Sequence, residues 1–154
     1  MKTIKFAQFP EDLSTVQRIF REYAEDLGFD LSFQDFEQEL ISLPGKYASP
    51  KGCLLLAWHE HEVVGCVAFR PIDDQTCEMK RLYVKSGLRS LNLGKQLVER
   101  ICNEARAQGY RKMLLDTLPS MQAAIRIYAS FGFKPVDPYV FNPIEGAMFL
   151  GVEL

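Results

Sequence analysis

Hydrophobic residues near the N-terminus recur with the spacing of a helix that has one apolar face. Between Pro10 and Gly28 the apolar positions lie three or four residues apart, which predicts an amphipathic helix, and glycine can take the left-handed conformation that ends one. A second helix is expected to begin at Ser32, which can cap it, and to end before Pro44. Residues 3–7 alternate enough to predict a strand ahead of both helices.

The middle of the chain alternates short apolar runs with polar turns. Residues 52–58, 63–69 and 77–84 predict three strands, and the polar residues 59–62 and 73–75 predict the turns between them. Strands that follow one another through short turns pair antiparallel. We therefore expect an antiparallel meander in this part of the chain.

After the meander, helix and strand patterns alternate. Residues 93–105 carry one apolar helical stripe and residues 112–118 form another apolar strand, so a parallel crossover is expected beside the meander. A further helix is predicted to begin at Pro119 or Ser120, and residues 147–152 are expected to form a last strand.

Composition limits the classes of function. A chain of 154 residues suits one domain, and 47% apolar with 25% charged residues is ordinary for a globular protein. The formal net charge of −2 gives no basic excess to attract nucleic acid or acidic membranes. The N-terminus lacks the apolar core of a signal peptide, and no apolar run approaches the roughly 18 residues of a membrane span, so a cytoplasmic location is expected.

The cysteines and histidines do not form a metal-binding pattern. The four cysteines contain no C-x-x-C pair and three lie in apolar runs, which predicts buried free thiols. His59 and His61 lie in a polar turn without further ligands at suitable spacing, so a solvated turn is favoured over a metal site.

Residues 79–101 are organised as a strand, a polar turn and the start of a helix. The first turn of a helix leaves backbone N–H groups unpaired, and the aligned peptide dipoles add partial positive charge, so such a turn favours a phosphate. Arg89 and Lys95 add two further positive charges. The pattern therefore predicts an anion-binding turn.

Two segments resemble the GCN5-related N-acetyltransferase superfamily. Residues 89–94, Arg-Ser-Leu-Asn-Leu-Gly after an apolar strand, are similar to its coenzyme-binding pattern Gln/Arg-x-x-Gly-x-Gly/Ala. Asn92 replaces the first glycine, and Asn tolerates a left-handed backbone. Residues 124–133 resemble the superfamily's Ala-x-x-x-Tyr-x-x-x-Gly-Phe ending, and Met121 stands where an Asn that contacts the coenzyme is often found.

The order of strands and helices extends this resemblance over nearly the whole chain. It implies the α/β (α+β) fold of acyl-CoA N-acyltransferases, with a mixed, mostly antiparallel sheet of six or seven strands flanked by about four helices, in a single N-acetyltransferase domain of residues 1–154. Acetyl-CoA is the implied cosubstrate, without a metal. The implied coenzyme contacts are Leu82, Tyr83, Val84, Arg89, Ser90, Leu91, Asn92, Leu93, Gly94 and Lys95.

The resemblance also implies two catalytic residues. Tyr128 is placed like the tyrosine that protonates the coenzyme sulfur in many members, and the alternative is a core aromatic residue. Glu78, on the strand before the turn, is placed like the general-base glutamate of some protein-acetylating members, and the alternative is a surface pair with Lys80. A period of two would put Glu78 on the same face as Lys80, Leu82 and Val84.

The acceptor is expected to contact the first two helices and the proline-broken segment near the C-terminus. The candidate residues are Tyr23, Phe29, Phe33, Tyr139, Phe141 and Asn142. They are aromatic or neutral, with Glu78 as the one carboxylate placed nearby, which favours a compact amine, either a small molecule or an amino acid. A protein lysine or N-terminus, a non-catalytic acyl-CoA-binding module and a nucleotide-binding regulatory domain are the alternatives. No nucleic-acid or membrane partner is expected, and a homodimer is left open.

Overall fold

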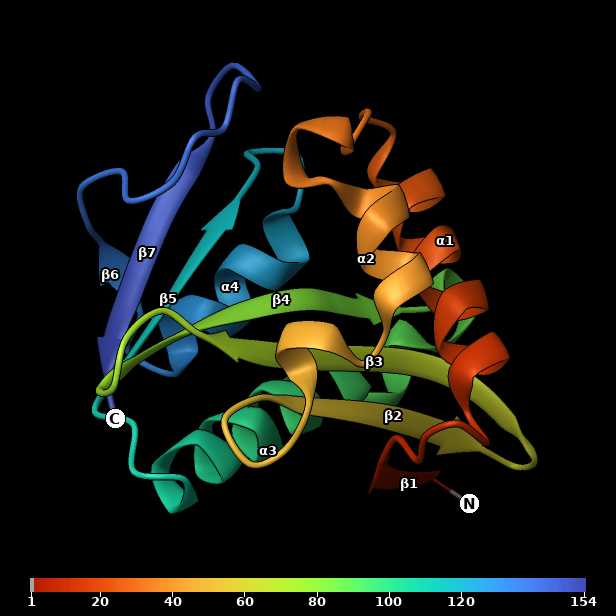
Figure 1. The fold of residues 1–154 in the computed structure, drawn as a ribbon. Coiled ribbons are helices and arrows are strands. Elements are labelled where there is room, and N and C mark those ends of the chain that lie inside the picture. The colour runs from red at the N-terminus through yellow and green to blue at the C-terminus, as the bar shows by residue number, and fades with distance from the viewer. Residues whose placement is uncertain (1) are drawn as a thin grey trace.

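A seven-stranded sheet runs through the molecule in the order β1-β2-β3-β4-β5-β7-β6 (Figure 1). The computed structural model describes residues 2–154. The strands are β1 (Lys2–Phe6), β2 (Cys53–His59), β3 (Glu62–Pro71), β4 (Thr76–Val84), β5 (Lys112–Thr117), β6 (Lys134–Pro135) and β7 (Met148–Glu153). The β4–β5 pair is parallel and the other described pairs are antiparallel. This confirms the predicted meander, crossover and mixed sheet.

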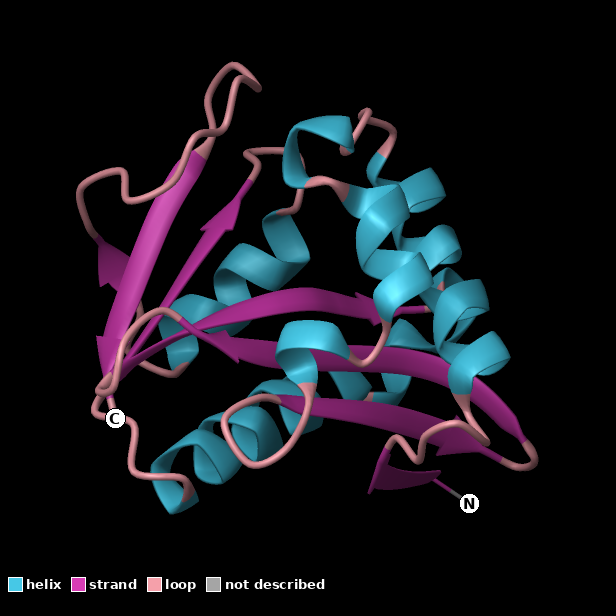
Figure 2. Cartoon of the chain, in the orientation of Figure 1, coloured by secondary structure: helices cyan, strands magenta, loops and turns pink. Residues whose placement is uncertain are grey.

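Four α-helices in the described chain cover the two faces of the sheet (Figures 1 and 2). They are α1 (Leu13–Leu27), α2 (Phe36–Ser42), α3 (Leu93–Ala107) and α4 (Gln122–Ser130). Helices α1 and α2 bury Phe20 and Leu40 with Leu56 of β2, whereas α3 and α4 bury Leu97 and Tyr128 on the opposite face. Because strand side chains alternate, β2 contributes to both cores.

The first predicted helix is confirmed, and the second is interrupted. Helix α1 ends at Gly28, which has φ 78°. The predicted helix from Ser32 to Leu43 is instead a 3-10 turn at residues 32–34 followed by α2. Asp35 separates them in the left-handed region at φ 54°, a conformation that Asp tolerates better than most residues. The Ser32 hydroxyl donates to Asp30 and caps no helix.

A β-bulge in β4 changes which face its side chains occupy. The pairing with β3 shifts register between Cys66 and Ala68, and Arg81 has φ 63°. A bulge inserts one residue, so the side-chain alternation reverses there. Leu82 and Val84 therefore pack in the core under α3, while Lys80 contacts Gln34 on the α1–α2 side. The prediction that one face carries Glu78, Lys80, Leu82 and Val84 is wrong for the two residues after the bulge.

Strands β4 and β5 separate soon after they begin. Their pairing extends only from Thr76 opposite Lys112 to Glu78 opposite Leu114, although both strands continue. Figure 1 shows β4 and β5 diverging beyond these pairs. The divergence leaves a fork, bordered by α1 and by the start of α4, in which a ligand can reach strand backbone.

Candidate functional site

Two adjoining hollows open at the fork between β4 and β5. The larger is an open space of about 1150 Å³, solvent included, between the end of β4 and the first turns of α3 and α4. The smaller, of about 540 Å³, lies between α1, the bulged part of β4 and the end of β5. Both are lined by Tyr23, Leu27, Leu82 and Met121, so the two hollows lie side by side.

The larger hollow contains the open N-terminus of α3. Asn92 precedes the helix in the left-handed conformation, at φ 64° and ψ 19°, as its replacement of a glycine requires. The first helical bond runs from the Gln96 N–H to the Asn92 carbonyl, so the N–H groups of Leu93, Gly94 and Lys95 have no partner within the helix. Lys95 is exposed, lines the hollow and forms no ion pair with residues 2–154. These groups suit a phosphate.

Gly94 permits α3 and α4 to approach each other at this hollow. A Cβ atom there would lie 3.0 Å from Cδ1 of Ile127 on α4. This is tighter than an ordinary van der Waals contact, so the end of the Ile127 side chain would have to shift to admit a Cβ atom. The glycine expected from the phosphate-binding pattern therefore also has a packing role.

Arg89 has two local partners, and one of them, Asp26, offsets the positive field of Arg89 at the turn. Its Nε donates to the Val84 carbonyl at 3.0 Å, and its Nη2 pairs with Oδ2 of Asp26 at 3.0 Å. The Asp26 carboxylate offsets part of the positive field that the sequence predicted from Arg89. Lys95 is consequently the less compensated of the two cations.

The end of β4 offers backbone groups to the larger hollow. The Lys85 N–H donates to Val64 of β3 at 2.9 Å, so by alternation Leu82 and Val84 direct their backbone groups away from β3, toward the fork. Arg89 occupies the Val84 carbonyl, but β5 no longer pairs at this level. This edge can accept an extended ligand as an added strand.

Tyr128 reaches the smaller hollow from α4. It is 5% exposed, and its hydroxyl has no hydrogen-bond partner in the described part of the chain. Burial raises the pKa of this hydroxyl, so the phenol carries its proton at neutral pH. The side chain packs against Phe133, as a core aromatic residue would, yet its ring also borders the hollow.

Glu78 lies beside the smaller hollow with both carboxylate oxygens engaged. It is 1% exposed and accepts hydrogen bonds from Arg70 Nε at 2.9 Å and from the Tyr139 hydroxyl at 2.7 Å. The alternative of a surface pair with Lys80 is wrong, because both residues are buried and Lys80 bonds to Gln34. A base at this position would act through Tyr139.

The predicted acceptor residues divide between the hollow and its rim. Tyr23, Phe33 and Asn142 line the smaller hollow. Tyr139 supports Glu78 outside it. Phe29 lines neither hollow and is 45% exposed, so the structure does not bring it to the site. Phe141 is 75% exposed and packs edge-on against Phe33, with ring centroids 6.4 Å apart.

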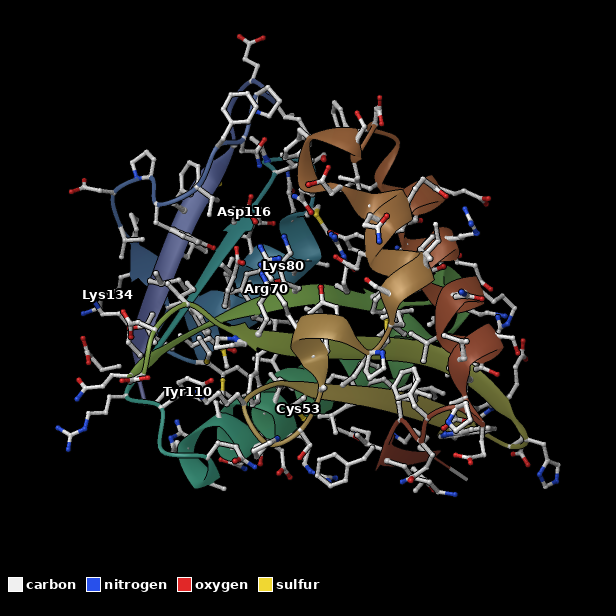
Figure 3. The ribbon with its side chains drawn as sticks, in the orientation of Figure 1. Cys53, Arg70, Lys80, Tyr110, Asp116 and Lys134 are labelled. Carbon is white, nitrogen blue, oxygen red and sulfur yellow. The ribbon has the colours of Figure 1, made fainter. Side chains whose placement is uncertain are left out.

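The smaller hollow is more strongly charged than the sequence predicted. Lys80, Arg81 and Asp116 line it, so Glu78 is not the one carboxylate near this hollow. Figure 3 labels Lys80 and Asp116. The Arg81 guanidinium is held by two bonds to Glu39, of 3.0 and 2.9 Å. Asp116 accepts from Asn142 Nδ2 at 2.9 Å. Charged residues inside apolar strands were the signal that could have identified them.

Comparisons with known proteins identify the family. A sequence model described as the acetyltransferase (GNAT) family matches residues 13–133. The chain belongs to this family. An N-acetyltransferase of Schizosaccharomyces pombe is 40% identical over 99% of this chain and 94% of its own length. An acetyltransferase of Streptococcus agalactiae superposes with a TM-score of 0.82 at 23% identity, over 99% of this chain and 98% of that one. A GNAT acetyltransferase of Elizabethkingia anophelis, solved with acetyl-CoA bound, has a TM-score of 0.67 at 24% identity, over 99% and 98%.

The family assignment confirms the GNAT fold and the N-acetyltransferase activity predicted from the sequence. The chain is an acyl-CoA-dependent N-acetyltransferase. The individual site residues stay predictions. Of the predicted coenzyme residues, the larger hollow brings together Leu82, Tyr83, Val84, Arg89, Asn92, Gly94 and Lys95. Leu91 and Leu93 turn their side chains to the core and offer only backbone, and the side chain of Ser90 lies outside what the structure describes.

Met121, the other departure from the GNAT pattern, precedes α4 and lines both hollows. Its sulfur lies 3.7 Å from the Thr117 hydroxyl, so the position presents a weak acceptor where an amide is common in the family. A coenzyme contact there would be apolar.

Cysteine and metal chemistry have no support in the described residues. The four cysteines are buried and unpaired, and burial raises the pKa of each thiol, which keeps it protonated. Residues 2–154 contain no group of three or more His, Cys, Asp or Glu side chains placed to hold a metal ion. Within the same residues, no helix is long and apolar enough to cross a membrane.

Proposed function

We propose that residues 1–154 form one domain that transfers the acetyl group of acetyl-CoA directly to the primary amine of a small molecule or an amino acid. One observation carries this proposal: the open α3 N-terminus and Lys95 border a hollow that adjoins a second hollow lined by Tyr128. The first suits the pyrophosphate of a coenzyme, and the second suits the reacting end.

The coenzyme would span both hollows. Its pyrophosphate would accept hydrogen bonds from the N–H groups of Leu93, Gly94 and Lys95. Its pantetheine arm would follow the unpaired edge of β4 at Leu82 and Val84, and its thioester would lie at the fork, where the two hollows meet.

The reaction would need one proton acceptor and one proton donor. The amine nitrogen attacks the thioester carbonyl, the new C–N bond forms and the C–S bond breaks. Tyr128 would give its proton to the departing sulfur, since its phenol is protonated at neutral pH and lines the hollow. The amine proton would pass through water to Tyr139, which lies outside the hollow, as Tyr139 passes its own proton to Glu78 along the 2.7 Å hydrogen bond that joins them. Solvent would restore both protonation states.

Two measurements test this function. In calorimetry, acetyl-CoA and CoA should bind and ATP should bind much more weakly, whereas equal affinity for ATP would favour a nucleotide-binding regulatory domain. In an assay of free thiol, acetyl-CoA should release CoA only when an acceptor amine is added. Binding without any amine-dependent release would identify a non-catalytic acyl-CoA-binding module.

A further inference from the structure

Lys80 is a buried cation in the wall of the smaller hollow. It is 6% exposed, and its Nζ donates to Gln34 Oε1 at 3.0 Å. No carboxylate oxygen of residues 2–154 lies within 4.0 Å of this nitrogen. An ammonium group has three donors, so two remain for a ligand. A buried charge without a counter-ion is costly, and an anionic ligand would remove that cost.

The neighbouring charges are already matched. Arg70 pairs with Glu78 at 2.9 Å, and Arg81 pairs with Glu39 at 2.9 Å. Within residues 2–154, the charged residues of this hollow without an ion-pair partner are Lys80 and Asp116. The described side-chain partner of Asp116 is the neutral Asn142. The two are close enough for Asp116 to raise the pKa of Lys80, but they form no ion pair with each other. The hollow thus presents one cation and one anion that no protein group bridges.

We propose, on the basis of the acetyltransferase function above, that the acceptor is an α-amino acid whose carboxylate binds Lys80 and whose amino group is received near Asp116. An amino acid carries both charges on adjacent atoms and complements this arrangement. Burial, and then Arg81, lower the pKa of Lys80 to about 8, so a bound carboxylate would stabilise its charged form.

The same charges disfavour a basic peptide as acceptor. A lysine side chain entering this hollow would bring a second ammonium group beside Lys80 but no carboxylate of its own, so Asp116 alone would have to offset both positive charges. A basic peptide would also need several carboxylates along an open groove, whereas Glu39 and Glu78 are engaged by arginines inside the protein.

The test compares amino acids with their carboxamides, which keep the amine and side chain but lose the negative charge. Thiol release would be measured with the full chain and acetyl-CoA for wild type and Lys80→Met, which keeps an unbranched apolar side chain but removes the ammonium group. The matched control is Lys112→Met, an exposed lysine at the start of β5 outside both hollows. Calorimetry with CoA would verify that the coenzyme site is unchanged.

Wild type and Lys112→Met should prefer the acids. Lys80→Met should lower kcat/KM for the acid by about 10- to 100-fold, the loss expected for a charge-assisted hydrogen bond, and change that for the amide by less than about threefold. Lys80→Gln keeps a hydrogen-bond donor but no charge, and it should lower kcat/KM for the acid in the same way as Lys80→Met. It replaces Lys80→Met if that variant does not fold.

Three results would overturn the proposal. If wild type releases thiol but uses acids and amides equally, the acceptor class is wrong while the acetyltransferase function stands. If both Lys80 variants lose acid and amide activity equally, Lys80 is structural. If no amine gives thiol release, the proposed function fails and this proposal with it.

Discussion

The charge at position 95 provides the sharpest test of where the coenzyme phosphates bind. Lys95→Glu changes the charge at the open end of α3 by two units without touching the core, since Lys95 is exposed. Two unit charges about 4 Å apart in water interact by about 1 kcal/mol, so a change of two units against one phosphate charge costs about 2 kcal/mol. This corresponds to roughly a 30-fold increase in the Kd for CoA.

Calorimetry with CoA at low ionic strength would measure this change in Kd. The change should be smaller in about 0.15 M salt, where the Debye length is about 8 Å and exposed charges are partly screened. Lys112→Glu makes the same charge change away from the hollow and should leave the Kd unchanged. Asp26→Asn removes the carboxylate paired with Arg89 and should tighten CoA by roughly twofold to fivefold. Equal Kd values for wild type and Lys95→Glu at low salt would refute the phosphate assignment.

Three further predictions concern the reacting end and the fold. Tyr128→Phe keeps the packing but removes the buried proton, so kcat should fall by about 100-fold while calorimetry gives an unchanged Kd for CoA; equal kcat would make Tyr128 a core residue only. Burial is the main cause that lowers the pKa of Lys80 to about 8, so its ammonium group is charged below that pH. The ratio of kcat/KM for an amino acid between wild type and Lys80→Met should therefore shrink as the pH rises from about 7 to 9. A ratio that does not change with pH would contradict this. Gly52→Ala would place Cβ 2.3 Å from the Lys46 carbonyl oxygen and should lower the free energy of unfolding by about 2 to 3 kcal/mol in urea titration, whereas Gly87→Ala, which meets open space, should change it by less than about 0.5 kcal/mol.

The conformation of the turn before α3 was predictable because its signals are local. Asn92 replaces a glycine, and Asn is one of the few residues that enters the left-handed region, where the structure places it. The helix that follows requires only the apolar stripe of residues 93–105, and that stripe lies in the core under the sheet. Neither inference depended on which distant segments meet.

The bulge at Arg81 was not predictable from alternation, because one inserted residue reverses every side chain after it. The charged pair Lys80 and Arg81 inside an apolar strand was visible in the sequence. Which side chains pair with these two residues depends on segments far along the chain. Gln34 lies 46 residues from Lys80, and Asn142 lies 26 residues from Asp116. The charged lining of the smaller hollow therefore could not be predicted from the sequence, because it depends on which distant segments the fold brings together.

The most direct test of the central claim is release of CoA from acetyl-CoA by the full chain with a panel of amino acids, with the product identified by mass. We expect each mole of thiol to be matched by one mole of N-acetyl amino acid, with no acetyl group gained by the enzyme itself. Acetyl-CoA that binds tightly but yields no amine-dependent thiol above the buffer rate would contradict it.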